Sequence, residues 1–153
     1  MSIKKSQLKS HNHCVFQISY HIVFVTKYRR KCLTEKMLLR LKEIFLEICK
    51  RWEIDLIEFG GEADHVHLLV EAHPNVFPSK FINSLKTLSS RYLRKDFEDH
   101  LKRYYWEKPV LWTRAYCLLS AGGAPIEIIK KYIENQGEPK SHTTRKRNSS
   151  PPK

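Results

Sequence analysis

The sequence IDLIEFGGEADHVHLLVE, residues 54–71, decides the fold of this chain. Its apolar and β-branched residues predict one short strand over 54–59 and another over 65–71. Gly60 and Gly61 predict a turn between them. The two strands are therefore expected to pair as a hairpin.

The segments on either side of this hairpin alternate between helical and extended patterns. Apolar residues at steps of three and four predict helices, and stretches rich in Val, Ile, Phe and Tyr predict strands. The elements predicted outside the hairpin are a strand over 14–25, a helix over 35–52 that Thr34 caps, a helix over 79–97, a strand over 111–120 and a helix over 125–136. The helix over 79–97 is expected to bury Phe81, Leu85, Leu88 and Tyr92.

This order of elements, β-α-β-β-α-β followed by a further helix, predicts an α+β fold. A ferredoxin-like or RRM-like antiparallel sheet has this order, with two helices on one face. The other face is then left for a ligand, a partner or the last helix, which carries Tyr132. We expect one domain over 13–137, a loose segment over 1–12 and a disordered basic tail over 138–153.

The chain is strongly basic, with 28 Lys and Arg against 16 Asp and Glu and a formal net charge of +12. Residues 137–153 have a net charge of +4, so the remaining 136 residues carry +8 by themselves. A basic body attracts polyanions, and nucleic acid is the leading candidate. A solvated basic surface without a specific partner is the alternative explanation of the same charge.

The cysteine spacing and the hydropathy bear on the compartment. Cys14, Cys32, Cys49 and Cys117 contain no C-x-x-C pair, which disfavours a zinc ribbon. We find neither a secretory signal nor an apolar run of membrane-spanning length. We therefore expect a cytoplasmic protein with reduced cysteines and no membrane partner.

His65 and His67 are two residues apart on a predicted strand. Residues at this spacing share one face, with Cα atoms about 7 Å apart, so both imidazoles can reach one divalent ion. Glu58, Glu62 and Asp64 are close in sequence and can accept hydrogen bonds from the imidazole N–H groups. Two histidines that only pack or form hydrogen bonds on a half-exposed strand are the alternative.

The last predicted helix places Tyr132 and Gln136 on one face, because residues four apart are neighbours on a helix. A tyrosine hydroxyl has a pKa of about 10 and is a weak nucleophile unless charge at the reaction centre is stabilised. A divalent metal on a phosphate can supply that stabilisation. The amide oxygen of Gln136 can join the two histidines as a ligand of Mg²⁺ or Mn²⁺. Amphipathic packing of Tyr132 is the alternative.

In their order, these motifs resemble the HUH single-tyrosine transposases of insertion sequences of the 200/605 type, including their REP-associated relatives. His65-Val66-His67 is similar to the HUH motif, and YIENQ at 132–136 is similar to the tyrosine motif. Further similar segments are YHIVFVTKYRRK at 20–31, Asp64, LW at 111–112 and GGAP at 122–125. The resemblance covers roughly residues 13–137.

The resemblance implies a metal-dependent enzyme that cleaves and rejoins single-stranded DNA. Tyr132 would attack a DNA phosphate, which leaves a 5′-phosphotyrosine link and a free 3′-OH, and the reverse step would join ends. His65, His67 and Gln136 would hold the divalent metal, with Asp64 supporting them. The implied partners are DNA single strands with hairpin ends and a second copy of the chain, which forms a homodimer with the first. The implied location is the cytoplasm, in association with the nucleoid.

A dense cationic loop and one helix face are the candidate DNA contacts. A tyrosine among cations is suited to base stacking together with phosphate contact. The candidate DNA-binding residues are Lys27, Tyr28, Arg29, Arg30, Lys31, Arg91 and Arg94. Binding through these residues is expected to weaken as salt rises.

Two alternatives to a transposase are kept open. A non-catalytic RRM-like nucleic-acid-binding module would carry aromatic residues on the exposed sheet positions, where this sequence places His65 and His67. Within the same chemistry, a domesticated relative that acts on genomic repeats is the second alternative.

Overall fold

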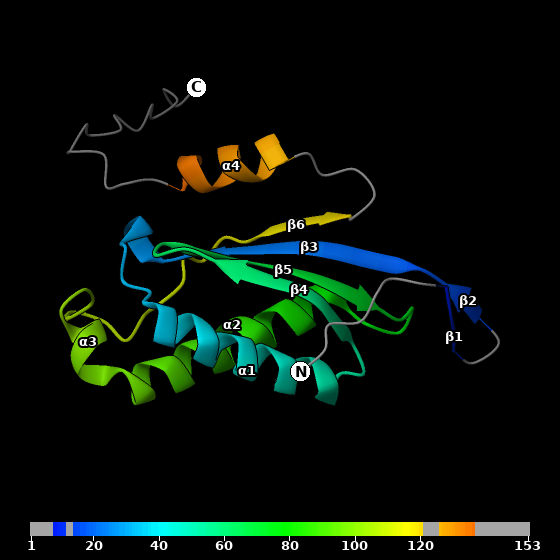
Figure 1. Ribbon diagram of the computed structural model, residues 1–153, viewed down its shortest axis with the longest axis horizontal. Coiled ribbons are helices and arrows are strands. Elements are labelled where there is room, and N and C mark those ends of the chain that lie inside the picture. Colours follow the sequence, from blue (N-terminus) through cyan, green and yellow to red (C-terminus); the bar gives the residue numbers. More distant parts are fainter. Residues whose placement is uncertain (1–7, 12–13, 121–125, 137–153) are drawn as a thin grey trace, which may run out of the picture.

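The computed structural model describes residues 8–11, 14–120 and 126–136 of the chain. In chain order the elements are β1 (Lys9–His11), β2 (Cys14–Phe16), β3 (Ile18–Val25), the 3₁₀ turn η1 (Lys27–Arg29), α1 (Glu35–Arg51), β4 (Asp55–Gly61), β5 (His65–Ala72), α2 (Pro78–Asp96), α3 (Glu98–Lys102), β6 (Cys117–Ser120) and α4 (Ile126–Asn135). α1 and α2 cover one face of the main sheet, and α4 lies over the other (Figure 1).

The main sheet has the strand order β4-β5-β3-β6, and all its neighbours are antiparallel. If these four strands are numbered 1 to 4 along the chain, their order across the sheet is 2-3-1-4. This is the order of a ferredoxin-like sheet, so the predicted α+β fold is confirmed. The two central strands β3 and β5 pair without interruption from Ile18 opposite Ala72 to Val25 opposite His65.

The larger core lies between the sheet and the two helices. Every second residue of β3 and β5 points to this side, as the alternation of side chains along a strand requires. The residues that these two strands contribute to the larger core are Ile22, Phe24, Val66, Leu68, Val70 and Ala72. At the start of α1, the Thr34 hydroxyl accepts a hydrogen bond from the Met37 N–H at 3.2 Å, so the predicted N-cap is confirmed.

The buried side of α2 differs from the prediction. Phe81 and Leu85 are buried as expected, but Tyr92 is 36% exposed and Leu93 is buried in its place. The stripe follows steps of four and passes through Ser89, whose hydroxyl accepts a hydrogen bond from the Trp112 indole N–H at 2.9 Å. Because Ser89 is polar, a search for apolar residues at helical spacing did not identify this face of α2 as the buried one.

The strands differ from the sequence-based expectation in three places. The turn predicted at Gly60 and Gly61 is wrong, because both glycines belong to β4 and pair with β5. The strand predicted over 14–25 is divided into β2 and β3, and β2 pairs with β1 inside the segment that was expected to be loose. The strand predicted over 111–120 is reduced to β6.

A lysine explains why the last strand is short. The Lys86 ammonium donates hydrogen bonds to the carbonyl oxygens of Thr113 at 2.6 Å and Arg114 at 2.7 Å. Before these residues, Trp112 forms only an isolated bridge with Thr26. The carbonyls of Thr113 and Arg114 thus bind a side chain of α2, while the Thr113 N–H still donates to the Val25 carbonyl oxygen at 2.8 Å.

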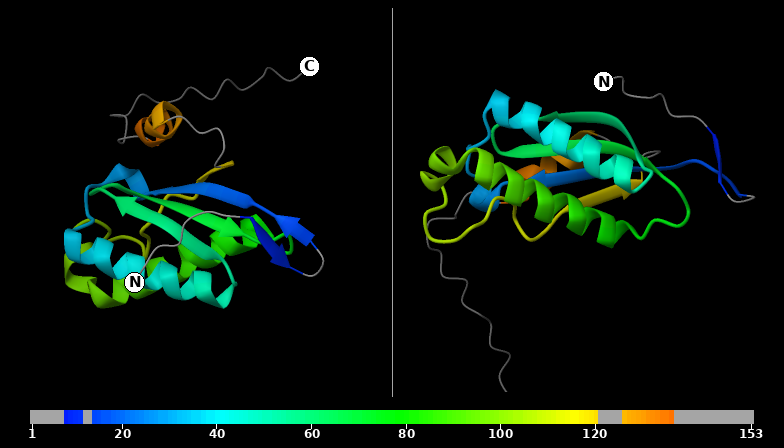
Figure 2. Two further views of the ribbon diagram at one scale, coloured as in Figure 1. Left: turned by 45° about the vertical axis from the view of Figure 1, so that its right-hand side comes forward. Right: turned by 90° about the horizontal axis from the view of Figure 1, so that it is seen from below.

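α4 packs on a second, smaller core on the other face of the sheet. Figure 2 shows α4 apart from α1 and α2, with the sheet between them. The fully packed members of this core are Val23, Val25, Cys117 and Ile133, and its half-buried members are Leu119, Ile129 and Tyr132. The sequence positions 121–125 and the tail over 138–153, which carried predictions, lie outside the described residues.

Candidate functional site

His65 and His67 lie on the face of β5 that α1 and α2 do not cover. Val66 between them is buried in the larger core, so the alternation of the strand directs both imidazoles to the face where α4 lies. The two ring centroids are 6.5 Å apart and the rings are inclined by 28°. The predicted shared face is therefore present.

A glycine makes room for His67. Gly60 is the partner of His67 across β4 and β5. A Cβ atom at residue 60 would lie 2.6 Å from Cε1 and 2.7 Å from Nε2 of the imidazole, closer than van der Waals contact allows. The ring of His67 therefore lies over the backbone of Gly60, and only glycine permits this position.

Asp64 fixes the orientation of His65. One carboxylate oxygen is 2.8 Å from Nδ1 of His65, and the other accepts a hydrogen bond from Nε of Arg29 at 3.1 Å. Burial raises the pKa of the Asp64 carboxyl, but the hydrogen bonds from His65 and Arg29 outweigh it and hold this pKa below its usual value. An ionised carboxylate can only accept, so the proton of His65 belongs on Nδ1 and the Nε2 lone pair is left for a ligand.

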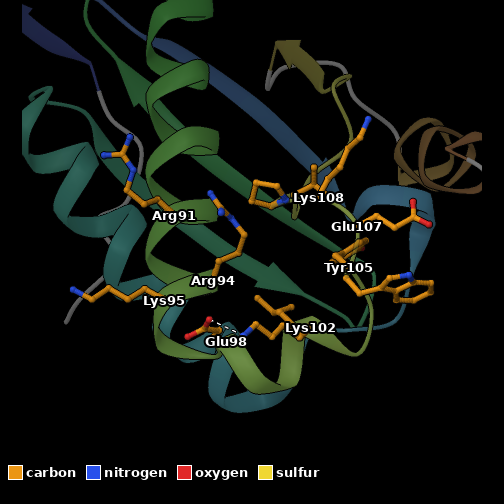
Figure 3. A pocket seen from close by; sticks show the side chains of 12 residues that line it. Arg91, Arg94, Lys95, Glu98, Lys102, Tyr105, Glu107 and Lys108 are labelled. Carbon is orange, nitrogen blue, oxygen red and sulfur yellow. Dashed lines mark ion pairs between the residues drawn. The ribbon is translucent and has the colours of Figure 1, made fainter.

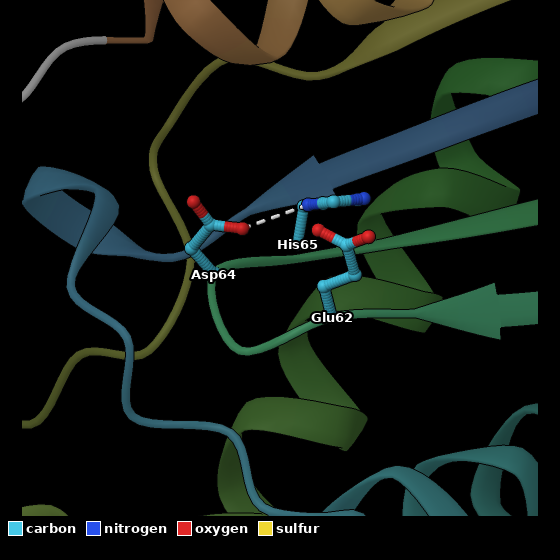
Figure 4. A group of neighbouring side chains, drawn as sticks. All are labelled: Glu62, Asp64 and His65. Carbon is cyan, nitrogen blue, oxygen red and sulfur yellow. Dashed lines mark hydrogen bonds and ion pairs between the residues drawn. The ribbon is translucent and has the colours of Figure 1, made fainter.

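Glu62 joins this group from the turn between β4 and β5. Glu62, Asp64 and His65 each offer one ligand atom, and these atoms lie within 4.8 Å of one another (Figure 4). Because Asp64 already binds His65 and Arg29, the exposed Glu62 carboxylate is the free oxygen donor of the cluster. Sequence reasoning treated Glu62 only as a partner for imidazole; its place in the turn directly before the histidines was the signal for a ligand.

The pKa of His67 is lowered, first by partial desolvation and then by the neighbouring charge of His65. A histidine binds a metal through a neutral ring nitrogen, so a lowered pKa favours the ligating form at neutral pH. The group within reach of one ion contains Glu62, Asp64 and His65, and the ring of His67 lies on the same face with its centroid 6.5 Å from that of His65. Imidazole and carboxylate donors suit a divalent metal. The chain therefore contains a candidate metal site at the β4–β5 turn.

Tyr132 lies in α4 and packs on the same face of the sheet as the histidines. It packs against the smaller core, which includes Val23 and Val25, the partners of His67 and His65 across β3 and β5. The hydroxyl is buried and has no hydrogen-bond partner among the described residues, and burial raises the pKa of Tyr132 to about 12. No hydrogen bond or ring contact within the described part of the chain joins Tyr132 to either histidine.

Gln136 follows the last turn of α4. Its backbone N–H donates to the carbonyl oxygen of Tyr132 at 3.2 Å, which keeps the two residues one helical turn apart as the sequence predicted. The structure thus brings Asp64, His65 and Glu62 together, and places Tyr132 in α4, over the same face, with Gln136 directly after that helix.

The predicted cationic loop corresponds to η1 and the residues that follow it. Tyr28 lies among cations as expected, with the Lys27 ammonium 5.3 Å and the Arg30 guanidinium 5.0 Å from its ring centroid. Arg29 differs from its neighbours, because its side chain pairs with Asp64. Lys31 is exposed. The other two candidates, Arg91 and Arg94, lie on α2.

Comparison with known proteins gives matches over most of this chain. The family model described as "Transposase IS200 like" matches residues 14–136. The ISDra2 transposase TnpA of Deinococcus radiodurans is 32% identical over 130 residues, which are 85% of this chain and 91% of that protein. The transposase for insertion sequence element IS200 of Salmonella typhimurium is 31% identical over 130 residues, 85% of this chain and 84% of that protein.

The fold is shared as well. A crystal structure of a Deinococcus radiodurans R1 protein superposes with a TM-score of 0.77 at 32% identity, over 84% of this chain and 98% of that chain. None of the helices in the described part of our structure is long and apolar enough to cross a membrane. The family match includes both the histidine strand β5 and the tyrosine helix α4. This chain therefore belongs to the IS200-like transposase family, and that membership supports a function as a DNA transposase.

Proposed function

We propose that this protein cleaves and rejoins single-stranded DNA at insertion-sequence ends, with Tyr132 as the nucleophile. The hydroxyl of Tyr132, buried on the histidine face without a partner among the described residues, is the observation that carries the proposal. A buried polar group without a hydrogen bond costs about 1–3 kcal/mol, so such a group needs an explanation. A phosphate that enters from outside the chain is a partner that would satisfy it.

The proposed step is a phosphoryl transfer. The Tyr132 oxygen forms a bond to phosphorus, and the bond from phosphorus to the 3′ oxygen of the preceding nucleotide breaks. The tyrosine proton ends on that 3′ oxygen, so the products are a 5′-phosphotyrosine link and a free 3′-OH. Attack by a 3′-OH on the link reverses the step and joins two ends without an external energy source.

His65, His67 and Gln136 are the proposed metal ligands, and Glu62 is added as a further oxygen donor. Asp64 holds His65 in the orientation that presents Nε2. The mixed nitrogen and oxygen set suits Mg²⁺ or Mn²⁺. When bound, such an ion neutralises charge on the phosphate oxygens.

In a single chain the Tyr132 hydroxyl is a weak nucleophile, so a further group must activate it. A pKa of about 12 leaves it almost fully protonated at neutral pH. We infer that the active form is a homodimer, in which α4 of one copy can lie beside the histidines of the other. Mixing a Tyr132→Phe chain with a His65→Ala/His67→Ala chain tests this: cleavage is restored only if one site draws on both copies.

The experiment that tests the proposal is adduct formation. The protein is incubated with Mg²⁺ or Mn²⁺ and labelled single strands, including predicted hairpin ends, from both sides of its own gene, and the products are separated on denaturing gels. We expect a protein–DNA adduct that is absent with Tyr132→Phe and in EDTA. Tight binding without an adduct on any strand contradicts the proposal, and an adduct that survives Tyr132→Phe means that another residue is the nucleophile.

A non-catalytic RRM-like binder is less well supported. The residues of β3 and β5 that face away from α1 and α2 include His21, Val23, Val25, His65, His67 and Leu69. None of these is Phe, Tyr or Trp, and α4 packs over Val23 and Val25. Such a module would also bind DNA with the same affinity in EDTA.

A further inference from the structure

Two loops that are far apart in sequence meet around one arginine. The guanidinium of Arg30 lies 5.0 Å from the ring centroid of Tyr28 and 5.3 Å from those of Tyr105 and Trp106. It also donates a hydrogen bond to the carbonyl oxygen of Tyr104. Arg30 thus joins η1 to the segment after α3, and holds aromatic rings from both in one cluster.

Two rings of this cluster are exposed rather than packed into the core. Trp106 is 68% exposed and Tyr28 is 48% exposed. The Arg30 guanidinium contacts both rings, so the two exposed rings belong to one site on the surface. Exposed aromatic rings beside a guanidinium are the components that proteins use to stack unpaired bases.

The backbone of Tyr28 and Arg29 has a disfavoured conformation. Tyr28 and Arg29 have φ of 59° and 54°, in the left-handed region that residues with a Cβ avoid. Two contacts stabilise the turn: Arg29 pairs with Asp64, and the Tyr105 hydroxyl donates to the carbonyl oxygen of Lys27 at 2.7 Å. The exposed position of Tyr28 is therefore imposed by the tertiary structure.

A cationic pocket adjoins the exposed rings. It has a volume of about 470 Å³, within the range of pockets that bind small ligands, and Tyr105 and Trp106 form part of its lining. Arg94 points into it from α2, whereas Arg91 and Lys95 of α2 and Lys108 line it with their charged ends directed outward (Figure 3). Of its two carboxylates, Glu98 is paired with Lys102, so the pocket favours an anion such as a phosphate.

We propose that the exposed rings of Tyr28 and Trp106, both in contact with Arg30, form a stacking surface, here called the clamp, for one unpaired nucleobase of a bound DNA strand, and that the pocket beside them holds the adjoining phosphates. The proposal rests on the proposed function for the identity of the strand as DNA. It adds a binding site outside the metal and tyrosine residues. Arg29 pairs with Asp64, which orients His65, and this connects the clamp to the candidate metal site.

The test uses full-length Tyr132→Phe protein in EDTA, so that binding is measured without cleavage. Unstructured single strands carry 2-aminopurine at successive positions, and its fluorescence is quenched where the base stacks on an aromatic ring. We expect quenching at one position and a dissociation constant raised roughly 5- to 140-fold by Trp106→Ala, the range that loss of one base–aromatic stack gives. Trp106→Phe is expected to retain most of the affinity and the quenching.

Leu39→Ala is the matched control. Leu39 is 67% exposed on α1 and belongs to neither loop, so its removal is expected to leave the dissociation constant unchanged. Thermal unfolding of both alanine variants verifies that exposed side chains were removed without loss of the fold. An abasic site in place of the quenched base should weaken binding to the wild-type chain as much as Trp106→Ala does.

The outcomes separate this inference from the proposed function. Unchanged affinity of Trp106→Ala and no quenched position, with a normal adduct from the Tyr132-containing chain, overturn the clamp and leave the transposase chemistry intact. Quenching without any adduct supports the clamp and contradicts the chemistry. Failure to bind single strands at all overturns both.

Discussion

At the residue scale, the position of His67 depends on the absence of a side chain at residue 60. Gly60→Ala places a Cβ 2.6 Å from the imidazole, so the ring must move. We expect Mn²⁺ binding, measured by isothermal titration calorimetry, to weaken about 10- to 100-fold, as for loss of other groups that orient a ligand. The fold is expected to persist, because Gly60 lies near the end of β4.

A double variant controls for an indirect effect of Gly60→Ala. If the methyl group acts through His67, then adding it to His67→Ala causes no further loss of Mn²⁺ affinity. Additive losses would mean that residue 60 affects the site by another route, such as a shift of the whole hairpin.

Asp64 links the site to stability at acidic pH. Its folded pKa is below the ordinary value of 3.8, so in the window beneath that value the unfolded chain binds more protons than the folded chain. The stabilisation is therefore complete above about pH 5 and is lost as pH falls through the lowered pKa. Urea unfolding midpoints between pH 2.5 and pH 7 should fall more steeply for wild type than for Asp64→Asn.

Asp96→Asn is the control for this measurement. Asp96 pairs with Arg40 at 2.8 Å, but its side chain is exposed, and exposed pairs contribute about 0–1 kcal/mol. We expect its acid profile to match that of wild type. An Asp64→Asn profile parallel to wild type would show that the Asp64 carboxylate contributes no acid-dependent stability.

At the scale of elements, α4 can be loosened without loss of the main fold. Ile133 packs with Val23, Val25 and Cys117 in the smaller core, apart from the residues between sheet and helices. Ile133→Ala is expected to reduce adduct formation about 100-fold, the scale of loss for a misplaced catalytic group. Amide exchange should accelerate in α4 and stay slow in β3 and β5.

Ile48→Ala on α1 is the comparison for this element. Ile48 belongs to the larger core, so its truncation is expected to lower global stability by about 2–5 kcal/mol. Equal changes in exchange across the whole sheet for both variants would contradict the independence of the smaller core.

At the scale of the whole molecule, the net charge of +12 predicts salt-dependent binding of single strands. The slope of log K against log salt is about −0.7 for each phosphate neutralised, so loss of one contact reduces its magnitude by about 0.7. Arg94→Gln, which removes a cation from the pocket, should show this change in fluorescence anisotropy titrations.

Arg51→Gln provides the matched loss of charge elsewhere. Arg51 pairs with Glu47 at 2.7 Å on the exposed surface of α1. We expect its salt slope to equal that of wild type. Equal slopes for Arg94→Gln and wild type would remove Arg94 from the DNA surface.

Local patterns predicted much of this architecture. The helices over α1, α2 and α4 lie within a residue or two of their expected bounds, because apolar periodicity and the Thr34 cap are properties of the chain itself. The predictions failed where a distant partner replaced a local rule. Ser89 is buried because Trp112 satisfies its hydroxyl, and the carbonyls of Thr113 and Arg114 bind Lys86 instead of a strand.

By itself the sequence determined the order of the main-sheet strands and of α1, α2 and α4, and with it the α+β class. It also determined the shared face of His65 and His67, since alternation along a strand needs no knowledge of its neighbours. The tertiary structure alone decided that Gly60 lies under His67 and that Arg29 pairs with Asp64. It also decided that Trp106 meets Arg30. These contacts join segments up to about 75 residues apart, and only the register of paired strands and the packing of loops brings them together.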